Sequence, residues 1–225
     1  MSGLLIAAPA SGSGKTTFTL GLLRALRQRG IAVASGKAGP DYIDPAFHAA
    51  AAGSPCLNFD PWAMHAELIS ANSALHRAGA RMLVIEGMMG LFDGAADGSG
   101  TPADLAAFLG LSVVLVVDAS RMSQSVAALV SGFANFRADI RIAGVVLNRV
   151  ASERHESMLR RALDAVRMPV LAVIGNEASL ALPERHLGLV QAGEHAALEH
   201  FIEAAAGIVS KACDFELLLR AAQQN

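Results

Sequence analysis

The chain has 225 residues, of which 53% are hydrophobic and 17% are charged. This composition excludes a disordered or fibrous protein, and the length indicates one large α/β domain or two small ones. The formal net charge is -2, with 18 Lys and Arg against 20 Asp and Glu. No overall positive field therefore favours a nucleic-acid or membrane partner, and no aliphatic run approaches the ~20 residues of a membrane span.

The cysteines and histidines carry no metal or disulfide signature. Cys56 and Cys213 are too few for a disulfide framework, and neither belongs to a C-x-x-C pair. This usage favours a reducing compartment, so we expect a cytoplasmic protein. The seven histidines show no metal-ligand spacing and most lie on predicted helices, so no functional role is predicted for them.

Short aliphatic runs, loops bearing Gly or Asp, and amphipathic helices recur along the chain, which predicts parallel βαβ units. The aliphatic runs do not alternate with polar residues, as expected when helices cover both faces of a sheet. The predicted fold is therefore α/β, with a mainly parallel β-sheet sandwiched by helices. Strands are expected at 3–8, 32–37, 82–86, 113–118, 142–147 and 170–174, and helices at 15–29, 63–77, 102–109, 123–136, 153–166 and 195–209.

Three of the predicted helix starts carry a side-chain oxygen immediately before a proline. They begin at Asp44, Asp60 and Thr101. A capping oxygen followed by proline at the first helical position is typical of a helix N-terminus.

The strongest motif is PASGSGKTT at residues 9–17, between a predicted strand and a predicted helix. This setting indicates a phosphate-binding loop, in which backbone N–H groups and the helix N-terminus surround phosphate oxygens. Lys15 should contact the β and γ phosphates, and the Thr16 hydroxyl should bind Mg²⁺. Pro9 stands where the general motif has glycine, and the alternative is a glycine-rich turn with a solvated lysine. The loop residues predicted to bind nucleotide are Ser11, Gly12, Ser13, Gly14, Lys15, Thr16 and Thr17.

A phosphate-binding loop also needs an acidic group to hold Mg²⁺ or its water shell, usually at the end of a neighbouring strand. Glu86 and Asp118 each end a predicted strand. We favour Glu86, because the glycines that follow it permit close approach of a ligand. Asp118 is expected to be a loop or capping residue before the next helix.

A second polar block, KAGPDYIDP at residues 37–45, follows the second predicted strand. It should therefore lie at the carboxyl edge of the sheet, where open α/β folds bind ligands. Asp41 could complete the Mg²⁺ shell, and Lys37 could bind a phosphate or a substrate carboxylate. Asp44 is either a helix cap or a functional residue. Asp93 has a similar alternative as a turn residue, and function is favoured because its loop also carries Glu86.

Four segments together resemble one family, the cobyrinate or hydrogenobyrinate a,c-diamide synthases of cobalamin biosynthesis, which are related to dethiobiotin synthetase. The second and third segments are far more specific than a phosphate-binding loop alone. The Pro9 position is itself similar to that family. The segments are residues 8–17, 37–45, 86–94 and 182–189.

The resemblance implies a dethiobiotin synthetase-like amidoligase domain at residues 1–210, with 211–225 a C-terminal helix or a linker toward a glutaminase domain. The implied reaction is ATP-dependent amidation of the a and c carboxylates of cobyrinic or hydrogenobyrinic acid through acyl phosphates. Lys37 and Asn148 join the implied nucleotide-binding residues, Asn148 by contacting the base. The implied catalytic residues are Lys15, Asp41, Asp44 and Asp93, and the implied Mg²⁺ ligands are Thr16, Asp41 and Glu86.

The chain departs from this family in length. A glutaminase needs a nucleophilic cysteine on a tight strand-to-helix turn, and neither Cys56 nor Cys213 has that setting. We therefore expect the synthetase domain alone, either a piece of a longer protein or one partner of a split enzyme, with ammonia supplied by a glutaminase domain that this chain lacks.

Two alternatives stay open, a dethiobiotin-type carboxylate-activating ligase and a regulatory or positioning ATPase. The second class carries an early loop lysine where this chain has Ala10. Whether the domain forms a homodimer, and how strictly it prefers ATP over GTP, also stay open.

Overall fold

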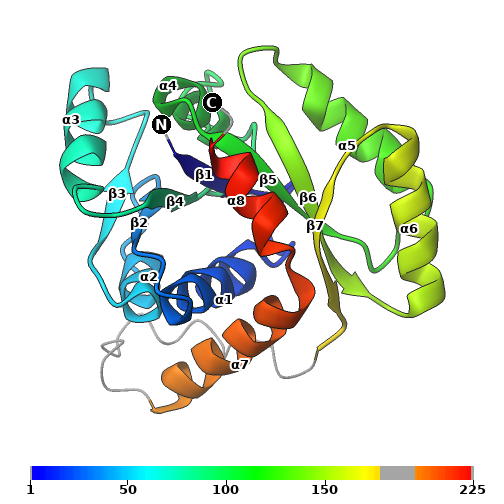
Figure 1. Ribbon diagram of the computed structural model, residues 1–225. Coiled ribbons are helices and arrows are strands. Elements are labelled where there is room, and N and C mark those ends of the chain that lie inside the picture. The colour runs from blue at the N-terminus through cyan, green and yellow to red at the C-terminus, as the bar shows by residue number, and fades with distance from the viewer. Residues whose placement is uncertain (1, 178–195, 224–225) are drawn as a thin grey trace.

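The computed structural model describes residues 2–177 and 196–223. Its strands form one seven-stranded sheet with helices on both faces (Figure 1). The strands are β1 (Gly3–Ala7), β2 (Val33–Ala38), β3 (Cys56–Phe59), β4 (Met82–Glu86), β5 (Ser112–Asp118), β6 (Ile142–Val150) and β7 (Val170–Gly175). The helices are α1 (Lys15–Gln28), α2 (Asp44–Ala52), α3 (Ala66–His76), α4 (Pro102–Leu109), α5 (Ser125–Phe136), α6 (Glu153–Ala165), α7 (Ala196–Ala212) and α8 (Phe215–Gln223).

The strand order is β3-β2-β4-β1-β5-β6-β7, and all neighbouring strands are parallel. The predicted helix-covered parallel sheet is thus confirmed. The phosphate-binding loop follows the central strand β1, and the strands on its two sides, β4 and β5, end in the two acidic candidates, Glu86 and Asp118.

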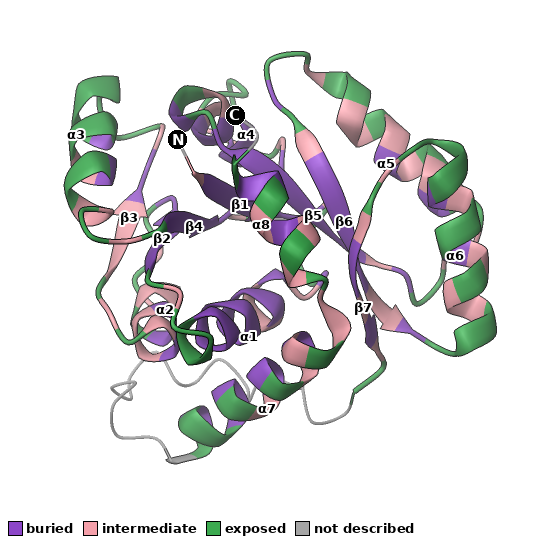
Figure 2. Cartoon of the chain, in the orientation of Figure 1, coloured by how far each residue is buried: buried purple, intermediate pink, exposed green. Residues whose placement is uncertain are grey.

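Alternate residues of β1, β4, β5 and β6 enter two separate hydrophobic cores. In β1, Leu4 and Ile6 pack in the core formed with α1, α2, α7 and α8, whereas Leu5 and Ala7 pack in the core formed with α3, α4, α5 and α6. Figure 2 shows the buried sheet between helices whose outer faces are exposed. Burial of both faces explains why the strand sequences are continuously apolar.

The helices α1 and α7 lie side by side on one face of the sheet (Figure 1). A Cβ on Gly21 of α1 would lie only 2.7 Å from the backbone oxygen of Ala205 in α7, so this close approach requires glycine. The segment after Lys211 forms α8, whose Leu218 and Ala222 are buried in the same core. The C-terminal helix is therefore packed on the domain.

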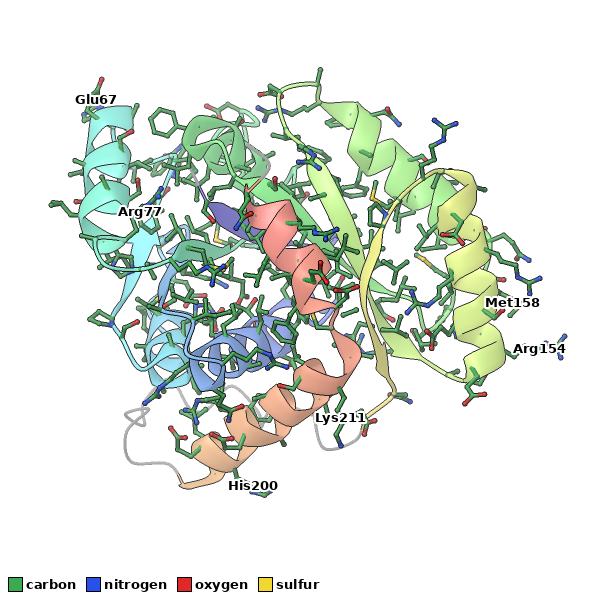
Figure 3. The ribbon with its side chains drawn as sticks, in the orientation of Figure 1. Glu67, Arg77, Arg154, Met158, His200 and Lys211 are labelled. Atoms are coloured by element: carbon green, nitrogen blue, oxygen red, sulfur yellow. The ribbon has the colours of Figure 1, made fainter. Side chains whose placement is uncertain are left out.

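Charged side chains project outward from the helices that cover the sheet. Figure 3 shows Glu67 on α3 and Arg154 on α6 pointing away from the sheet. None of the described helices is both long enough and apolar enough to cross a bilayer. The charges that matter for a site lie at the carboxyl ends of the strands.

One of the three expected helix caps is confirmed. Thr101 and Asp104 form a capping box at α4, in which the Thr101 hydroxyl accepts the Asp104 N–H at 3.0 Å and the Asp104 carboxylate accepts the Thr101 N–H at 2.9 Å. Asp60 instead caps a turn at residues 61–63, accepting the N–H groups of Trp62 and Ala63, and α3 begins only at Ala66.

The expected cap by Asp44 is wrong. Asp44 lies inside the first turn of α2, and its side chain caps no N–H group. Asp41 takes this role, because its Oδ1 accepts the N–H groups of Ile43 and Asp44 at 2.8 and 3.0 Å. Asp44 is thereby left with its carboxylate on Lys37.

The sequence did not predict β3, a four-residue strand at the edge of the sheet. Its sequence, CLNF, interrupts the apolar run with Asn58 and is too short for a clear pattern. The expected helix at 195–209 is α7, which ends at Ala212.

Candidate functional site

A cavity of about 400 Å³ opens at the carboxyl ends of β1, β2 and β4. The predicted nucleotide loop lines it through Ser11, Gly12, Gly14, Lys15, Thr16 and Thr17. The predicted polar residues Lys37, Asp41, Asp44 and Glu86 line it as well. The fold thus brings three separate sequence blocks into one place, at the sheet edge where ligands bind open α/β folds.

The nucleotide loop needs glycine at particular positions. Gly12 and Gly14 have φ values of 79° and 95°, in the left-handed region that side chains disfavour. A Cβ on Gly14 would also lie 2.2 Å from Nδ2 of Asn148. Ser13 is buried and donates its hydroxyl to the carbonyl of Ala10 at 2.9 Å, which holds the loop closed.

Lys15 is held by a backbone carbonyl of the loop after β4. Its Nζ donates to the oxygen of Met89 at 2.6 Å, and burial lowers the pKa of Lys15. Met89 has a positive φ of 47°. The next residue, Gly90, donates its N–H to Asp93 Oδ2 at 2.8 Å. Asp93 therefore has the turn role that was its alternative. It does not line the cavity, and its catalytic role stays a prediction.

Glu86 is the centre of a buried cluster, with a side chain that is 1% exposed. Its Oε1 accepts the Thr16 hydroxyl at 2.7 Å and the Lys37 ammonium at 2.9 Å. Its Oε2 lies 2.7 Å from Nε2 of His48. Burial alone would raise the pKa of Glu86, but Lys37 and His48 hold it well below its usual range. The carboxylate is therefore ionised and fixed by three donors.

Lys37 joins Glu86 to the other two carboxylates. The parallel register places Lys37 opposite Glu86 on neighbouring strands, and Lys37 Nζ lies 2.5 Å from Asp44 Oδ2 and 3.8 Å from Asp41 Oδ2. Burial and the nearby Glu86 raise the pKa of Asp44. Burial also opposes ionisation of Asp41, but the backbone N–H groups of Asp44 and Ile43 keep the pKa of Asp41 low.

The sequence missed two residues that shape this cluster. His48 is fully buried in α2 and contacts Glu86 directly. Asn58 of β3 donates to the backbone oxygens of Gly39 and Asp41 at 2.8 and 2.7 Å, which fixes the loop that carries Asp41. The i,i+4 spacing of Asp44 and His48 on one helix face was the only signal for His48.

A second polar group lies at the ends of β5 and β6. Asp118 pairs with Arg149 and accepts the N–H of Ser120 at 2.9 Å, so it has the loop role expected for it. Arg149, which the sequence did not single out, lines the cavity and donates to the Gly12 oxygen at 3.1 Å. Asn148 donates to the Ser13 backbone oxygen at 2.9 Å and so contacts the nucleotide loop.

The donor set at Thr16 and Glu86 fits Mg²⁺ bound together with a nucleotide. Within residues 2–177 and 196–223, no group of three His, Cys, Asp or Glu side chains is arranged to hold a metal by itself. Mg²⁺ in phosphate-binding loops instead uses a Ser or Thr hydroxyl, phosphate oxygens, water and an acidic neighbour. The Thr16 hydroxyl donates its hydrogen bond to Glu86, which leaves the oxygen lone pairs for a metal.

Neither cysteine has the setting of a nucleophile on a strand-to-helix turn. Burial and the neighbouring Asp214 raise the pKa of Cys213 to about 12, so its thiol is protonated at neutral pH. Cys56 lies on the edge strand β3, with its Sγ 3.7 Å from Nδ1 of the buried His48.

Comparison with curated proteins gives relatives across nearly the whole chain. The chain is 69% identical to a hydrogenobyrinate a,c-diamide synthase of a Sinorhizobium species, with 97% of this chain and 50% of that protein covered. It is 65% identical to one of Rhizobium meliloti (strain 1021), with 99% and 52% covered, and 53% identical to one of Rhodobacter capsulatus, with 98% and 51% covered. The chain spans about half the length of these relatives. The resemblance found in the sequence is confirmed, although its segment at 182–189 lies outside the described residues.

A solved structure of chloroplast FtsY from Physcomitrella patens shares the fold, with a TM-score of 0.57 at 17% identity over 76% of this chain and 58% of that chain. The family model described as the CobQ/CobB/MinD/ParA nucleotide binding domain matches residues 4–190. Because that match covers most of the chain and includes the whole cavity wall described above, the chain belongs to the CobQ/CobB/MinD/ParA nucleotide binding domain family.

Proposed function

We propose that this chain is the synthetase half of an amidoligase that converts the a and c carboxylates of hydrogenobyrinic or cobyrinic acid to amides, using ATP and ammonia. The names of its relatives support the substrate class. The observation that carries the proposal is the convergence of Lys15, Thr16, Lys37 and Glu86 on one cavity. That set combines a phosphate-binding loop with cations able to hold an anionic substrate.

Nucleotide would bind with its phosphates against the N-terminus of α1. The backbone N–H groups of the loop and the Lys15 ammonium would hold the β and γ phosphates, with Lys15 exchanging the Met89 carbonyl for a phosphate oxygen. Bound Mg²⁺ would supply charge neutralisation at the transferred phosphoryl group. Thr16 and Glu86 are the residues proposed to hold it, with Asp41 nearby, and Asn148 is proposed to contact the base.

The chemistry proceeds in two balanced steps. A carboxylate oxygen of the corrin attacks the γ-phosphorus, and the bond from that phosphorus to ADP breaks, which gives an acyl phosphate and ADP. The nitrogen of ammonia then attacks the acyl carbon, the C–O bond breaks, phosphate leaves with the former carboxylate oxygen, and the nitrogen loses a proton. Lys15 and Lys37 would stabilise the charge on the phosphoryl oxygens. Asp41, Asp44 and Asp93 are proposed to align the substrate or help to activate it.

The ammonia is proposed to come from another domain. We propose a glutaminase domain as its source, because the relatives are about twice as long as this chain and neither Cys56 nor Cys213 suits glutamine hydrolysis. The cytoplasm is the proposed location.

The proposal is tested by incubating the chain with Mg-ATP and either corrin acid, with ammonium chloride or glutamine as nitrogen donor. Mass spectrometry should show mono- and diamides with ammonium at alkaline pH, where more of the neutral amine is present, and none with glutamine. Lys15→Ala should lower the rate by about 100-fold or more while the protein stays folded. A Cys56→Ser, Cys213→Ser double variant should match the parent. Absence of amides with both acids, or unchanged ATP turnover in folded Lys15→Ala, would overturn the proposal.

A further inference from the structure

His48 is a fully buried side chain whose two ring nitrogens face different partners. It lies one turn after Asp44 in α2. Nε2 lies 2.7 Å from Glu86 Oε2, and Nδ1 lies 3.7 Å from the Cys56 sulfur. Because the ring is inaccessible, His48 cannot touch a substrate in the cavity, and it does not line that cavity. Any role in the reaction must therefore pass through Glu86.

The hydrogen bond from His48 determines how Glu86 can turn. The opposite oxygen, Oε1, accepts both the Thr16 hydroxyl and the Lys37 ammonium. Lys37 also donates to Asp44, so its ammonium group divides its hydrogen bonds between Asp44 and Glu86. Only His48 holds Oε2 among the described contacts of that oxygen. Without it, the carboxylate could rotate about its terminal torsion, which is broad in Glu side chains.

Rotation of Glu86 would also release the Thr16 hydroxyl. The Thr16 hydroxyl has a single proton, which it donates to Oε1 at 2.7 Å. This hydrogen bond orients the hydroxyl so that its lone pairs can face the cavity. A rotated carboxylate would leave that proton free to point into the metal position. Residues that orient a metal-binding side chain typically change metal affinity by 10–100-fold when they are lost.

We propose that His48 is a positioning residue for the metal of the nucleotide site, which fixes Glu86 through Nε2 and thereby orients Thr16. The inference rests on the proposed function only in that Mg-nucleotide binds at Thr16 and Glu86. It adds a residue from α2, outside the nucleotide loop and outside the strand that carries the acid.

Two substitutions separate the hydrogen bond from charge and burial. In His48→Gln, the amide nitrogen takes approximately the place of Nε2 and keeps a donor on Glu86. In His48→Asn, the shorter amide reaches only the position of Nδ1, beside Cys56, and loses that donor. Both variants are neutral and polar, so they differ mainly in the bond to Glu86.

The readout is the affinity of Mn²⁺, used as a paramagnetic probe, for the complex with ATP, measured by electron paramagnetic resonance. His48→Asn should bind Mn²⁺ about 10–100-fold more weakly than the parent, and His48→Gln should remain within about threefold. ATP binding without metal should be equal in all three proteins. Thermal melting checks that each variant is folded.

Folded His48→Asn that binds Mn²⁺ as tightly as the parent would overturn the inference, as would equal weakening in both variants. If His48→Asn does not fold, NMR of the ¹⁵N-labelled parent decides: the Nε2 proton should stay hydrogen-bonded and slow to exchange in the Mg-ATP complex, and its loss would contradict the inference.

If the parent itself binds no Mn²⁺ with ATP, the proposed function fails together with the inference. Failure of His48→Asn to weaken Mn²⁺ in a binding-competent parent rejects only the inference.

Discussion

Two acidic residues end the strands on either side of β1, and their surroundings differ sharply. Glu86 ends β4, where it and Lys37 have side chains only 1% and 5% exposed. Asp118 ends β5, where it and Arg149 are 31% and 43% exposed. The comparison shows that two acids in equivalent positions at the ends of strands can have very different environments. Burial and the number of donors around the carboxylate distinguish the two.

The difference has an energetic consequence. Removing one partner from a buried ion pair leaves the other charges without compensation, at a typical cost of about 3–5 kcal/mol. An exposed pair typically contributes only about 0–1 kcal/mol, because water and salt screen it. Substitutions in the buried cluster at the site should therefore lower the stability of the fold, whereas substitutions in the exposed pair should not.

The largest expected effect is on folding. Glu86→Gln should lower the free energy of unfolding by about 3 kcal/mol or more at neutral pH, because buried Lys37 keeps its charge with one carboxylate fewer and His48 loses the carboxylate that keeps it protonated. Asp118→Asn should lower it by less than about 1 kcal/mol. Urea denaturation of the two variants measures both values. Equal losses would show that the burial contrast has no energetic meaning.

The same pair of variants should separate in catalysis. Glu86→Gln should lower ATP-dependent amidation by about 100-fold and raise the Mg²⁺ concentration required, because a neutral amide holds the metal and the Thr16 hydroxyl poorly. Asp118→Asn should stay within about threefold of the parent. Rates measured over a Mg²⁺ titration test this ranking, and a raised requirement only in Asp118→Asn would reverse it.

The buried cluster should also make stability depend on pH. Burial would lower the pKa of His48, but Glu86 raises it from 6.5 to about 9. A raised pKa stabilises the folded state fully below pH 6.5, and this contribution is lost as pH rises through about 9. The nucleotide-free parent and Asp118→Asn should both lose roughly 3 kcal/mol over that interval. Urea denaturation at several pH values should show a flatter dependence in His48→Gln, and an unchanged slope in that variant would assign the effect elsewhere.

The smallest effect concerns the loop that joins the two regions. Gly14→Ala should weaken nucleotide binding by about tenfold, because its Cβ would meet Asn148 at the end of β6. Gly12→Ala is the matched control, since it has a similar positive φ but no atom within 4 Å of its Cβ. Fluorescent-nucleotide titration should rank Gly14→Ala below Gly12→Ala. Equal affinities would mean that the contact with Asn148 has no effect on nucleotide binding.

The sequence predicted those parts of the site that are local along the chain. Motif spacing and the glycines after Glu86 pointed to the loop and to Glu86, and both line the cavity, whereas the preference for Glu86 over Asp118 as the functional acid stays a prediction. The parallel sheet followed from continuous apolar runs between helices. These signals suffice because each depends on residues that are close together in the sequence.

The parts that were missed depend on packing between distant elements. His48 and Glu86 are 38 residues apart in sequence, and they meet only because the fold brings α2 to the end of β4. Asn58 acts through the unpredicted edge strand β3. A helix cap was one of two alternatives for Asp44, but Asp41 satisfies those N–H groups and Lys37 binds Asp44. No local pattern reveals such competition between partners.

The central claim, activation of a corrin carboxylate as an acyl phosphate by this chain, is tested most directly with corrin acid carrying ¹⁸O in its a and c carboxylates. The substrate is incubated with the purified chain, Mg-ATP and ammonium, and the released phosphate is analysed by mass spectrometry. The acyl-phosphate route predicts one ¹⁸O atom in inorganic phosphate for each amide formed, and the release of labelled phosphate should fall about 100-fold in Lys15→Ala. Amide formation with unlabelled phosphate, or with the label in AMP, would contradict it.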